Sequence, residues 1–112
     1  MLVDGIYKVS FGSNVGMSGQ GLVTIANGSV NGGDFGYLYQ GAIKESSSGL
    51  EATLNISQHD KSAQSVFGSL TNFTLVLGGT LLNDKSFNVS GAVAEQPGLQ
   101  ITINGFFLKP LV

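Results

Sequence analysis

The chain has 112 residues, which suit one domain, and its five basic and seven acidic residues give a net charge of −2. Because charged residues are only 11% of the chain, no basic surface is expected to pair with phosphates, which argues against direct nucleic-acid binding. The lack of cysteine excludes disulfides, thiolate metal sites and a cysteine nucleophile, and it mildly favours the cytoplasm. No apolar run approaches the ~20 residues of a membrane helix, and the first residues lack the pattern of a signal peptide, so no membrane span is expected.

Apolar residues recur with a period of two along most of the chain, a pattern that predicts antiparallel strands with one buried face. The five clearest stretches have as their apolar phase Tyr7, Val9 and Phe11; Leu50, Ala52, Leu54 and Ile56; Phe73, Leu75, Leu77 and Leu81; Phe87, Val89 and Val93; and Leu99, Ile101, Ile103 and Phe107. Two further runs, within residues 22–26 and 37–45, bring the clear strands to seven, and an eighth is expected around Ser29–Asn31.

Short polar segments separate these runs, as hairpin connections do. The expected turns and loops are Asn27–Gly28, Asn31–Gly32, Ser46–Gly49, Asn83–Ser86 and Gln96–Gly98. Consecutive hairpins make a meander, and the single long connection spans residues 58–72. Within it, Asp60 is predicted to cap one short helical turn that ends at Gly68.

Four glycines fall in the middle of strands and in the apolar phase: Gly41, Gly79, Gly91 and Gly105. Because glycine weakens a strand interior, the shared phase needs a physical reason. The first interpretation is that inward glycines allow the sharp coiling that closes a small barrel. The alternative is that the missing side chains leave room for a ligand. We therefore predict an all-β fold with residues 1–112 as a single domain: a small up-and-down antiparallel β-barrel of about eight strands, with a sandwich as the second choice.

The residues with catalytic potential do not form a recognisable site. His59 precedes Asp60, but the pair lies in a polar connection without a nucleophile, so we interpret His59 as a solvated loop residue. The acidic residues are scattered, mostly near turns. With one histidine and no cysteine, a transition-metal site is not expected. We expect no catalytic residue, no metal and no cofactor, and hence a protein that is not an enzyme.

Two glycine-rich segments, Ser13–Gly21 and Asn31–Asp34, raise the question of a phosphate-binding loop. Each runs into a strand rather than a helix, so no helix N-terminus is available to hold an anion. Asp34 is instead predicted to accept hydrogen bonds from nearby loop amides and so to fix its turn.

Three tyrosines, Tyr7, Tyr37 and Tyr39, share the inward phase if the alternation holds. They are candidates for presenting hydroxyl groups to a ligand in the barrel interior. The alternative is ordinary core packing at the mouth of the barrel.

Several segments resemble the family of negative regulators of type III secretion, the GrlR-like family. They are "DGIYKVSFGSN" (Asp4–Asn14), the "GQG" that follows, "GGDFGYLYQG" (Gly32–Gly41) and "FFLKPLV" (Phe106–Val112), in the same order and with the same spacing as in that family. The resemblance implies a lipocalin-like, eight-stranded antiparallel barrel that forms a homodimer. It also implies a bacterial regulatory protein that binds a transcriptional activator and does not catalyse a reaction.

In that family, an acidic loop after the "YQG" strand contributes to binding the activator. The matching positions are Glu45, Ser46, Ser47 and Ser48, and the resemblance makes them the candidate partner-binding residues, although only Glu45 is charged. The first hypothesis is therefore a dimeric regulatory protein that contacts a protein partner near this loop. The second is a lipocalin-like carrier of a small apolar ligand, held in an interior of aliphatic and aromatic side chains.

Overall fold

The protein folds as a closed barrel of eight antiparallel strands, as the sequence predicts. The structure, a computed structural model, describes residues 2–112, and Met1 lies outside the described residues. The strands are β1 (Gly5–Ser13), β2 (Ser18–Ala26), β3 (Ser29–Gly33), β4 (Tyr37–Ser46), β5 (Gly49–Gln58), β6 (Asn72–Asn83), β7 (Ser86–Val93) and β8 (Gln96–Lys109). Each strand pairs with its neighbours in the chain, and β1 pairs with β8 to close the barrel.

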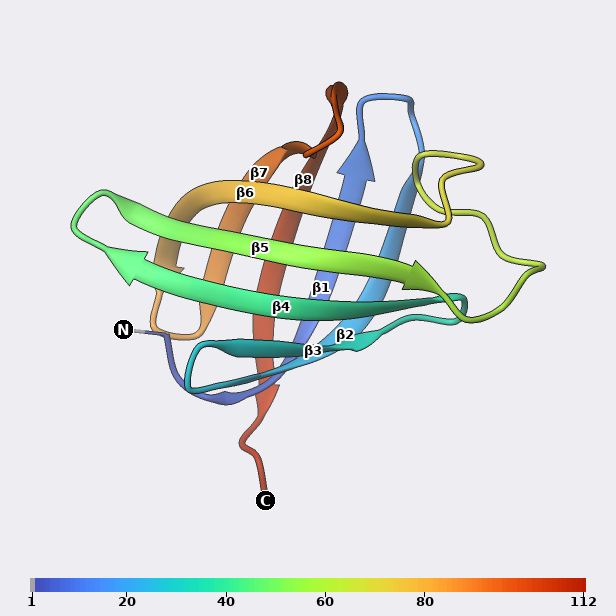
Figure 1. The fold of residues 1–112 in the computed structure, drawn as a ribbon. Coiled ribbons are helices and arrows are strands. Elements are labelled where there is room, and N and C mark those ends of the chain that lie inside the picture. Colours follow the sequence, from blue (N-terminus) through green and yellow to red (C-terminus); the bar gives the residue numbers. More distant parts are fainter. Residues whose placement is uncertain (1) are drawn as a thin grey trace.

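Strands β4, β5 and β6 cross over β7, β8, β1 and β2, so the barrel has two walls that face each other across the core (Figure 1). We call the end that carries connections 14–17, 34–36, 59–71 and 94–95 the loop end. The opposite end, which we call the terminal end, carries the tight turns 27–28, 47–48 and 84–85. Figure 1 shows both chain termini on the side of these tight turns.

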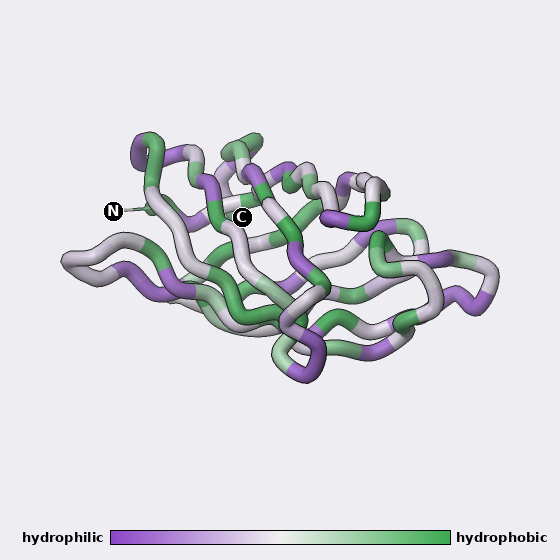
Figure 2. Tube along the Cα trace, turned by 90° about the horizontal axis from the view of Figure 1, so that it is seen from above, coloured by the Kyte–Doolittle hydropathy of each residue, from purple (hydrophilic) through white to green (hydrophobic). Residues whose placement is uncertain are grey.

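The alternation of apolar and polar residues sets which side chains fill the barrel. The inward phase predicted from the sequence is the buried phase in every one of the five stretches, from Tyr7 and Val9 in β1 to Ile101 and Ile103 in β8. The hydropathy changes repeatedly along the strands, and several turns are hydrophilic (Figure 2). Because opposite walls bury apolar side chains against each other, removal of this surface from water supplies the main stabilisation of the fold.

The tight turns follow the prediction in part. Asn27 and Gly28 have φ of 51° and 81°, the positive values that a two-residue hairpin turn requires. The predicted turn at Asn31–Gly32 is wrong, because both residues pair within β3 and the chain reverses at residues 34–36 instead. The loop predicted at Gln96–Gly98 is displaced, since the chain already turns at residues 94–95 and β8 begins at Gln96.

The helical turn predicted within residues 58–72 is also wrong, since residues 2–112 contain no helix. Asp60 Oδ1 accepts hydrogen bonds from Ser62 N at 2.9 Å and Ser62 Oγ at 2.7 Å, which makes a local side-chain turn in place of a helix cap. Gly68 has a φ of +73° and closes a small bridge to Ser65. This irregular path lets Phe67 reach the core, where its ring meets Phe73 edge-on at 5.6 Å. Residues 2–112 accordingly include no helix long and apolar enough to cross a membrane.

The inward glycines lie where neighbouring atoms approach the backbone. At Gly41, Gly79 and Gly91, an added methyl group would overlap a backbone carbonyl oxygen of the adjacent strand. At Gly105 it would overlap the ring of Phe87. The volume that these missing side chains leave is thus occupied by neighbouring strands and by one ring, as strong coiling of the barrel wall requires.

Candidate functional site

The barrel interior contains an apolar cavity of about 160 Å³. Its wall is built from inward side chains of all eight strands, among them Val9, Val23, Leu75 and Ile103. Polar side chains enter the wall at the loop end, from the ends of strands and from the connections that cover them. The cavity therefore has an apolar wall and a polar mouth, the usual arrangement of a small-molecule pocket.

Aromatic rings fill the barrel at the terminal end. The Tyr7 ring, which is fully buried, lies 5.9 Å from the Phe87 ring and meets the Phe107 ring edge-on at 5.7 Å. Its hydroxyl donates a hydrogen bond of 2.5 Å to the carbonyl oxygen of Val3. Burial first, and then the negative charge of the nearby carboxylates with Asp84 foremost, raises the pKa of Tyr7 to about 12. Tyr7, Phe87 and Phe107 thus form an aromatic plug that closes this end of the barrel. Tyr7 keeps its proton there, and it does not line the cavity.

Tyr39 and Asp34 form the most polar part of the mouth. The Tyr39 hydroxyl donates a hydrogen bond to Asp34 Oδ2, while Asp34 Oδ1 accepts bonds from Gly36 N at 2.9 Å and Tyr37 N at 2.8 Å. Burial, followed by the hydrogen bond to Asp34, raises the pKa of Tyr39 well above its usual value. The tyrosine thus stays neutral and donates, and the carboxylate acts as the acceptor that joins the turn to the barrel interior.

Two residues of the opposite wall determine where the Tyr39 ring lies. A methyl group on Gly21 would stand 2.7 Å from Tyr39 Cε2 and 2.8 Å from its hydroxyl oxygen, so only glycine leaves space for the ring at this point. Phe11 meets the same ring edge-on, with centroids 6.1 Å apart. Sequence reasoning missed Gly21, although continuing the inward phase of Val23 back by two residues would have found it.

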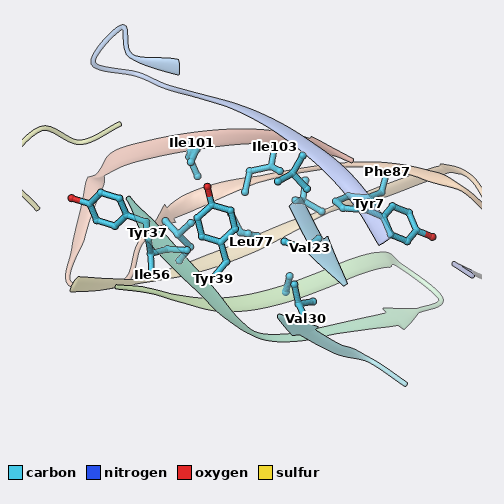
Figure 3. Packing of buried hydrophobic residues seen from close by; sticks show 14 of the residues in the cluster. Tyr7, Val23, Val30, Tyr37, Tyr39, Ile56, Leu77, Phe87, Ile101 and Ile103 are labelled. Atoms are coloured by element: carbon cyan, nitrogen blue, oxygen red, sulfur yellow. The ribbon is translucent and has the colours of Figure 1, made fainter. Parts of the chain in front are cut away.

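The three tyrosines grouped by the sequence do face the interior, but they do not form one site. Figure 3 shows Tyr7 and Tyr37 at opposite ends of the cluster of buried residues, with Tyr39 between them. The Tyr37 hydroxyl donates to the carbonyl oxygen of Leu70 at 3.2 Å and accepts from Gln58 Nε2 at 3.4 Å, both weak contacts. Tyr37 and Tyr39 belong to the mouth, whereas Tyr7 belongs to the plug.

The long connection of residues 59–71 covers the mouth. Ser13 Oγ donates to the carbonyl oxygen of Val66 at 2.7 Å, and Gln58 Nε2 donates to that of Ala63 at 2.9 Å. His59 N donates to Gly36 O at 2.8 Å, which ties this connection to the Asp34 turn. Sequence reasoning did not assign the connection to the site, and the signal for it was a short apolar group, with Phe67 at its centre, inside a polar segment.

His59 itself is exposed and lies outside the cavity wall. Its Nε2 is 3.0 Å from the carbonyl oxygen of Asp34, so the imidazole holds a backbone group of the mouth. Among residues 2–112, no three His, Cys, Asp or Glu side chains come close enough together to hold a metal ion.

The candidate partner-binding residues lie on the hairpin between β4 and β5, at the terminal end and away from the mouth. Glu45, Ser46, Ser47 and Ser48 are all exposed, and this hairpin extends past the neighbouring strands (Figure 1). Glu45 Oε2 accepts a hydrogen bond from Leu2 N at 3.1 Å, and Ser46 Oγ lies 3.0 Å from Ser48 Oγ. The hairpin is thus braced internally and by the N-terminal segment, with its outer surface open to solvent.

Comparison of the chain with models of protein families and with curated proteins found no match.

Proposed function

We propose that the protein is a non-enzymatic regulatory protein that acts by binding a protein partner. The observation that carries this proposal is the exposed β4–β5 hairpin, which projects from a closed barrel and presents Glu45 and three serines to solvent. Its surface carries little charge, so the free-energy cost of desolvating it in a protein interface is small. The resemblance to negative regulators of type III secretion supplies the kind of partner, a transcriptional activator, and with it a homodimer that works in the cytoplasm.

The chemistry of the site supports a binding role over catalysis. The single imidazole of the chain, that of His59, contacts a backbone carbonyl, and the Asp60 carboxylate is engaged by Ser62. Tyr39 keeps its proton because its pKa is raised, so it is a hydrogen-bond donor at neutral pH and a poor base. These groups hold loops together, which is a structural task.

Reversal of the charge on the hairpin tests the proposal. We expect Glu45→Lys to weaken capture of the partner by roughly tenfold, because a desolvated ionic contact is worth about 1–2 kcal/mol at an interface. Glu95→Lys is the matched control, since Glu95 is exposed in the turn at residues 94–95, at the opposite end of the barrel. Circular dichroism should show the same barrel for both variants. Equal capture by wild type and Glu45→Lys would contradict the proposed role of the hairpin.

A second candidate function is carriage of a small apolar ligand, and the apolar cavity of about 160 Å³ in the barrel interior is the observation that favours it. Apolar cavities of about 150 Å³ in proteins stay dry and take up molecules such as benzene, so a cavity of this size can hold a small guest. The mouth and the hairpin lie at opposite ends of the barrel, so one molecule has room for both functions.

A further inference from the structure

We propose that the barrel cavity is a binding site for a neutral molecule of about one ring that carries a single hydrogen-bond donor, and that it rejects anionic ligands such as fatty acids. This inference rests on the second candidate function, the carriage of a small ligand, and it specifies the class of ligand. Size, wall chemistry and the charge at the mouth each narrow that class.

The size of the cavity sets the upper limit of the guest. Its volume of about 160 Å³ is close to that of cavities that take up benzene and is well below the ~300–1,000 Å³ of pockets for drug-sized molecules. Tyr7 and Phe87 close the terminal end, so a long chain cannot continue through the barrel. A monocyclic guest fits this space, and an acyl chain of lipid length does not.

The polar groups of the wall are gathered at the mouth, where they set the orientation of the guest. Asp34, Tyr39, Gln64 and Ser65 line the cavity at the loop end, and the deeper wall is aliphatic and aromatic. A guest therefore gains most by turning an apolar ring inward and a single polar group toward the mouth. Two polar groups on opposite sides of the ring would leave one of them unpaired in the apolar wall, which costs free energy.

The hydrogen bonds already formed at the mouth determine which polar group of a guest can bind there. Asp34 accepts three protein hydrogen bonds, from two backbone amides and from the Tyr39 hydroxyl. An ionised carboxylate has about four acceptor positions, so one acceptor position remains on Asp34. The Tyr39 oxygen also retains acceptor capacity, because its proton is directed at Asp34. Gln64 and Ser65, which also line the mouth, can donate as well as accept, but Asp34 is the one carboxylate there. Because hydrogen bonds to a charged acceptor are the strong ones, a ligand that donates to Asp34 gains more than one that accepts from these neutral groups.

The charge at the mouth excludes anions. Asp34 is the one charged side chain that lines the cavity among the described residues, and the lining includes no lysine or arginine. An anionic guest would be moved out of water next to a carboxylate with no cation to compensate, and both effects oppose binding. The site therefore differs from a fatty-acid pocket in charge as well as in length.

The experiment compares three probes of equal ring size: para-fluorophenol, fluorobenzene and para-fluorobenzoate, each titrated with the full-length protein and followed by fluorine NMR. We expect para-fluorophenol to bind about tenfold tighter than fluorobenzene, which corresponds to one net hydrogen bond, and para-fluorobenzoate not to bind. Equal binding of fluorobenzene and para-fluorophenol, or binding of para-fluorobenzoate, would overturn the proposed ligand class while leaving ligand carriage intact. Binding of none of the three would overturn both.

Two matched variants show whether the probes enter the barrel. Ala52 lines the cavity, whereas Ala42 is exposed on the outer face of the neighbouring strand. Ala52→Leu should abolish binding of para-fluorophenol, and Ala42→Leu, which makes the same chemical change outside the barrel, should leave it unchanged. Equal loss in both variants would contradict binding in the cavity.

A third variant addresses the charge. Asp34→Asn keeps an oxygen that can accept the amides of Gly36 and Tyr37 but removes the negative charge, so only the cost of desolvation still opposes an anion. The affinity for para-fluorobenzoate should therefore rise relative to wild type. If Asp34→Asn folds and binds this probe no better than wild type, desolvation alone excludes anions and the assignment of anion exclusion to Asp34 is wrong. The ranking of the three probes on wild-type protein decides the ligand class even where this variant is unstable.

Discussion

At the scale of single residues, Asp34 links the surface turn to the barrel interior. The sequence predicts an aspartate that accepts hydrogen bonds from loop amides, because short polar side chains do so in turns of this composition, and Gly36 N and Tyr37 N do bind it. Its third partner, the Tyr39 hydroxyl, could not be predicted. That contact depends on how far the ring of β4 reaches across the barrel, which the period of two does not specify.

The hydrogen bond between Tyr39 and Asp34 should be worth more than an ordinary one because its acceptor is ionised. We expect Tyr39→Phe to lower the free energy of unfolding by roughly 1.5–3 kcal/mol, measured by urea denaturation. Tyr37→Phe is the matched control, since it removes a hydroxyl whose contacts of 3.2 and 3.4 Å are weak. The control should lose no more than about 1 kcal/mol. A loss in Tyr37→Phe as large as that in Tyr39→Phe would contradict the special role of the Asp34 contact.

The two buried tyrosines also predict how stability depends on alkaline pH. The folded protein raises the pKa of Tyr7 from 10.0 to about 12, so the unfolded chain loses this proton first as the pH rises. The stabilisation is complete below pH 10 and is lost between pH 10 and 12, where the free energy of unfolding should fall by up to ~1.4 kcal/mol per pH unit for each tyrosine that ionises only on unfolding.

Urea midpoints measured across this alkaline range check the prediction. The pKa of Tyr39 is raised as well, by burial and by its bond to Asp34, so Tyr39→Phe should make the decline with pH shallower. Identical slopes in wild type and Tyr39→Phe would show that Tyr39 ionises as readily in the folded protein as in the unfolded chain.

At the scale of elements, the positions of the strands could be predicted well, and the connections less well. Alternation identifies strands because one-sided burial imposes it, and the inward phases from Leu50 to Phe107 all agree with the structure. The tight turn predicted at Asn31–Gly32 is wrong because the same dipeptide can serve either a tight turn or a close approach of two strands. Here it serves the close approach, since a methyl group on Gly32 would overlap the carbonyl oxygen of Leu22. Composition alone does not separate these two uses.

The prediction of a helical turn in the long connection was wrong for a related reason. Asp60 has the side chain of a helix cap, but the same carboxylate can close a local turn with Ser62, and no apolar helical face follows to favour the helix. Burial of Phe67 against Phe73 dominates the path of this segment instead. A sequence pattern does not report a contact between a loop and a strand when the loop has no regular period.

The inward glycines give a prediction for a whole strand pair. In Gly91→Ala the new methyl group would collide with the carbonyl oxygen of Val76 on β6, so the pair of β6 and β7 must move apart. We expect a loss of roughly 1–3 kcal/mol in the free energy of unfolding. Gly98→Ala on β8 is the matched control, because nothing lies within 4 Å of its added methyl group. If the two variants unfold at the same urea concentration, Gly91 is not a point of close approach.

At the scale of the whole molecule, the outer wall carries a mostly apolar row, and we propose that it is the face that contacts a second copy of the chain. Phe106, Leu22 and Leu38 are 49%, 52% and 45% exposed, and strand pairing places them in one row across β8, β1, β2, β3 and β4. Lys8 and Gly33 complete the row. A single twofold axis can pair such a row with itself, and the resemblance implies a homodimer.

A charge placed in this row should separate the two copies. We expect Leu22→Glu to shift the protein from dimer to monomer at micromolar concentration in light scattering. The interface would have to desolvate two new carboxylates, and the neighbouring Lys8 on β1 does not offset that cost once both charges are buried. Val76→Glu is the control, since Val76 is similarly exposed, at 54%, on β6 outside the row. A dimer that persists in Leu22→Glu but dissociates in Val76→Glu would place the interface on the other wall.

The closed barrel itself could be predicted because several independent features favour it: the meander of hairpins, the length of the chain and the inward phase of four glycines. The cavity could not, because its volume is the small difference between the size of the barrel and the sum of its inward side chains. A single inward substitution, such as Ala52→Leu, would change this volume substantially.

We propose that this barrel works by binding another protein through its β4–β5 hairpin. Native mass spectrometry of the protein isolated intact from its own host tests the claim most directly, because it reports every bound chain and retained small molecule together. We expect two copies of the chain in a stoichiometric complex with a partner protein, and loss of that partner mass in Glu45→Lys but not in Glu95→Lys. A chain that is isolated without any partner protein, or a partner retained equally by both variants, would contradict it.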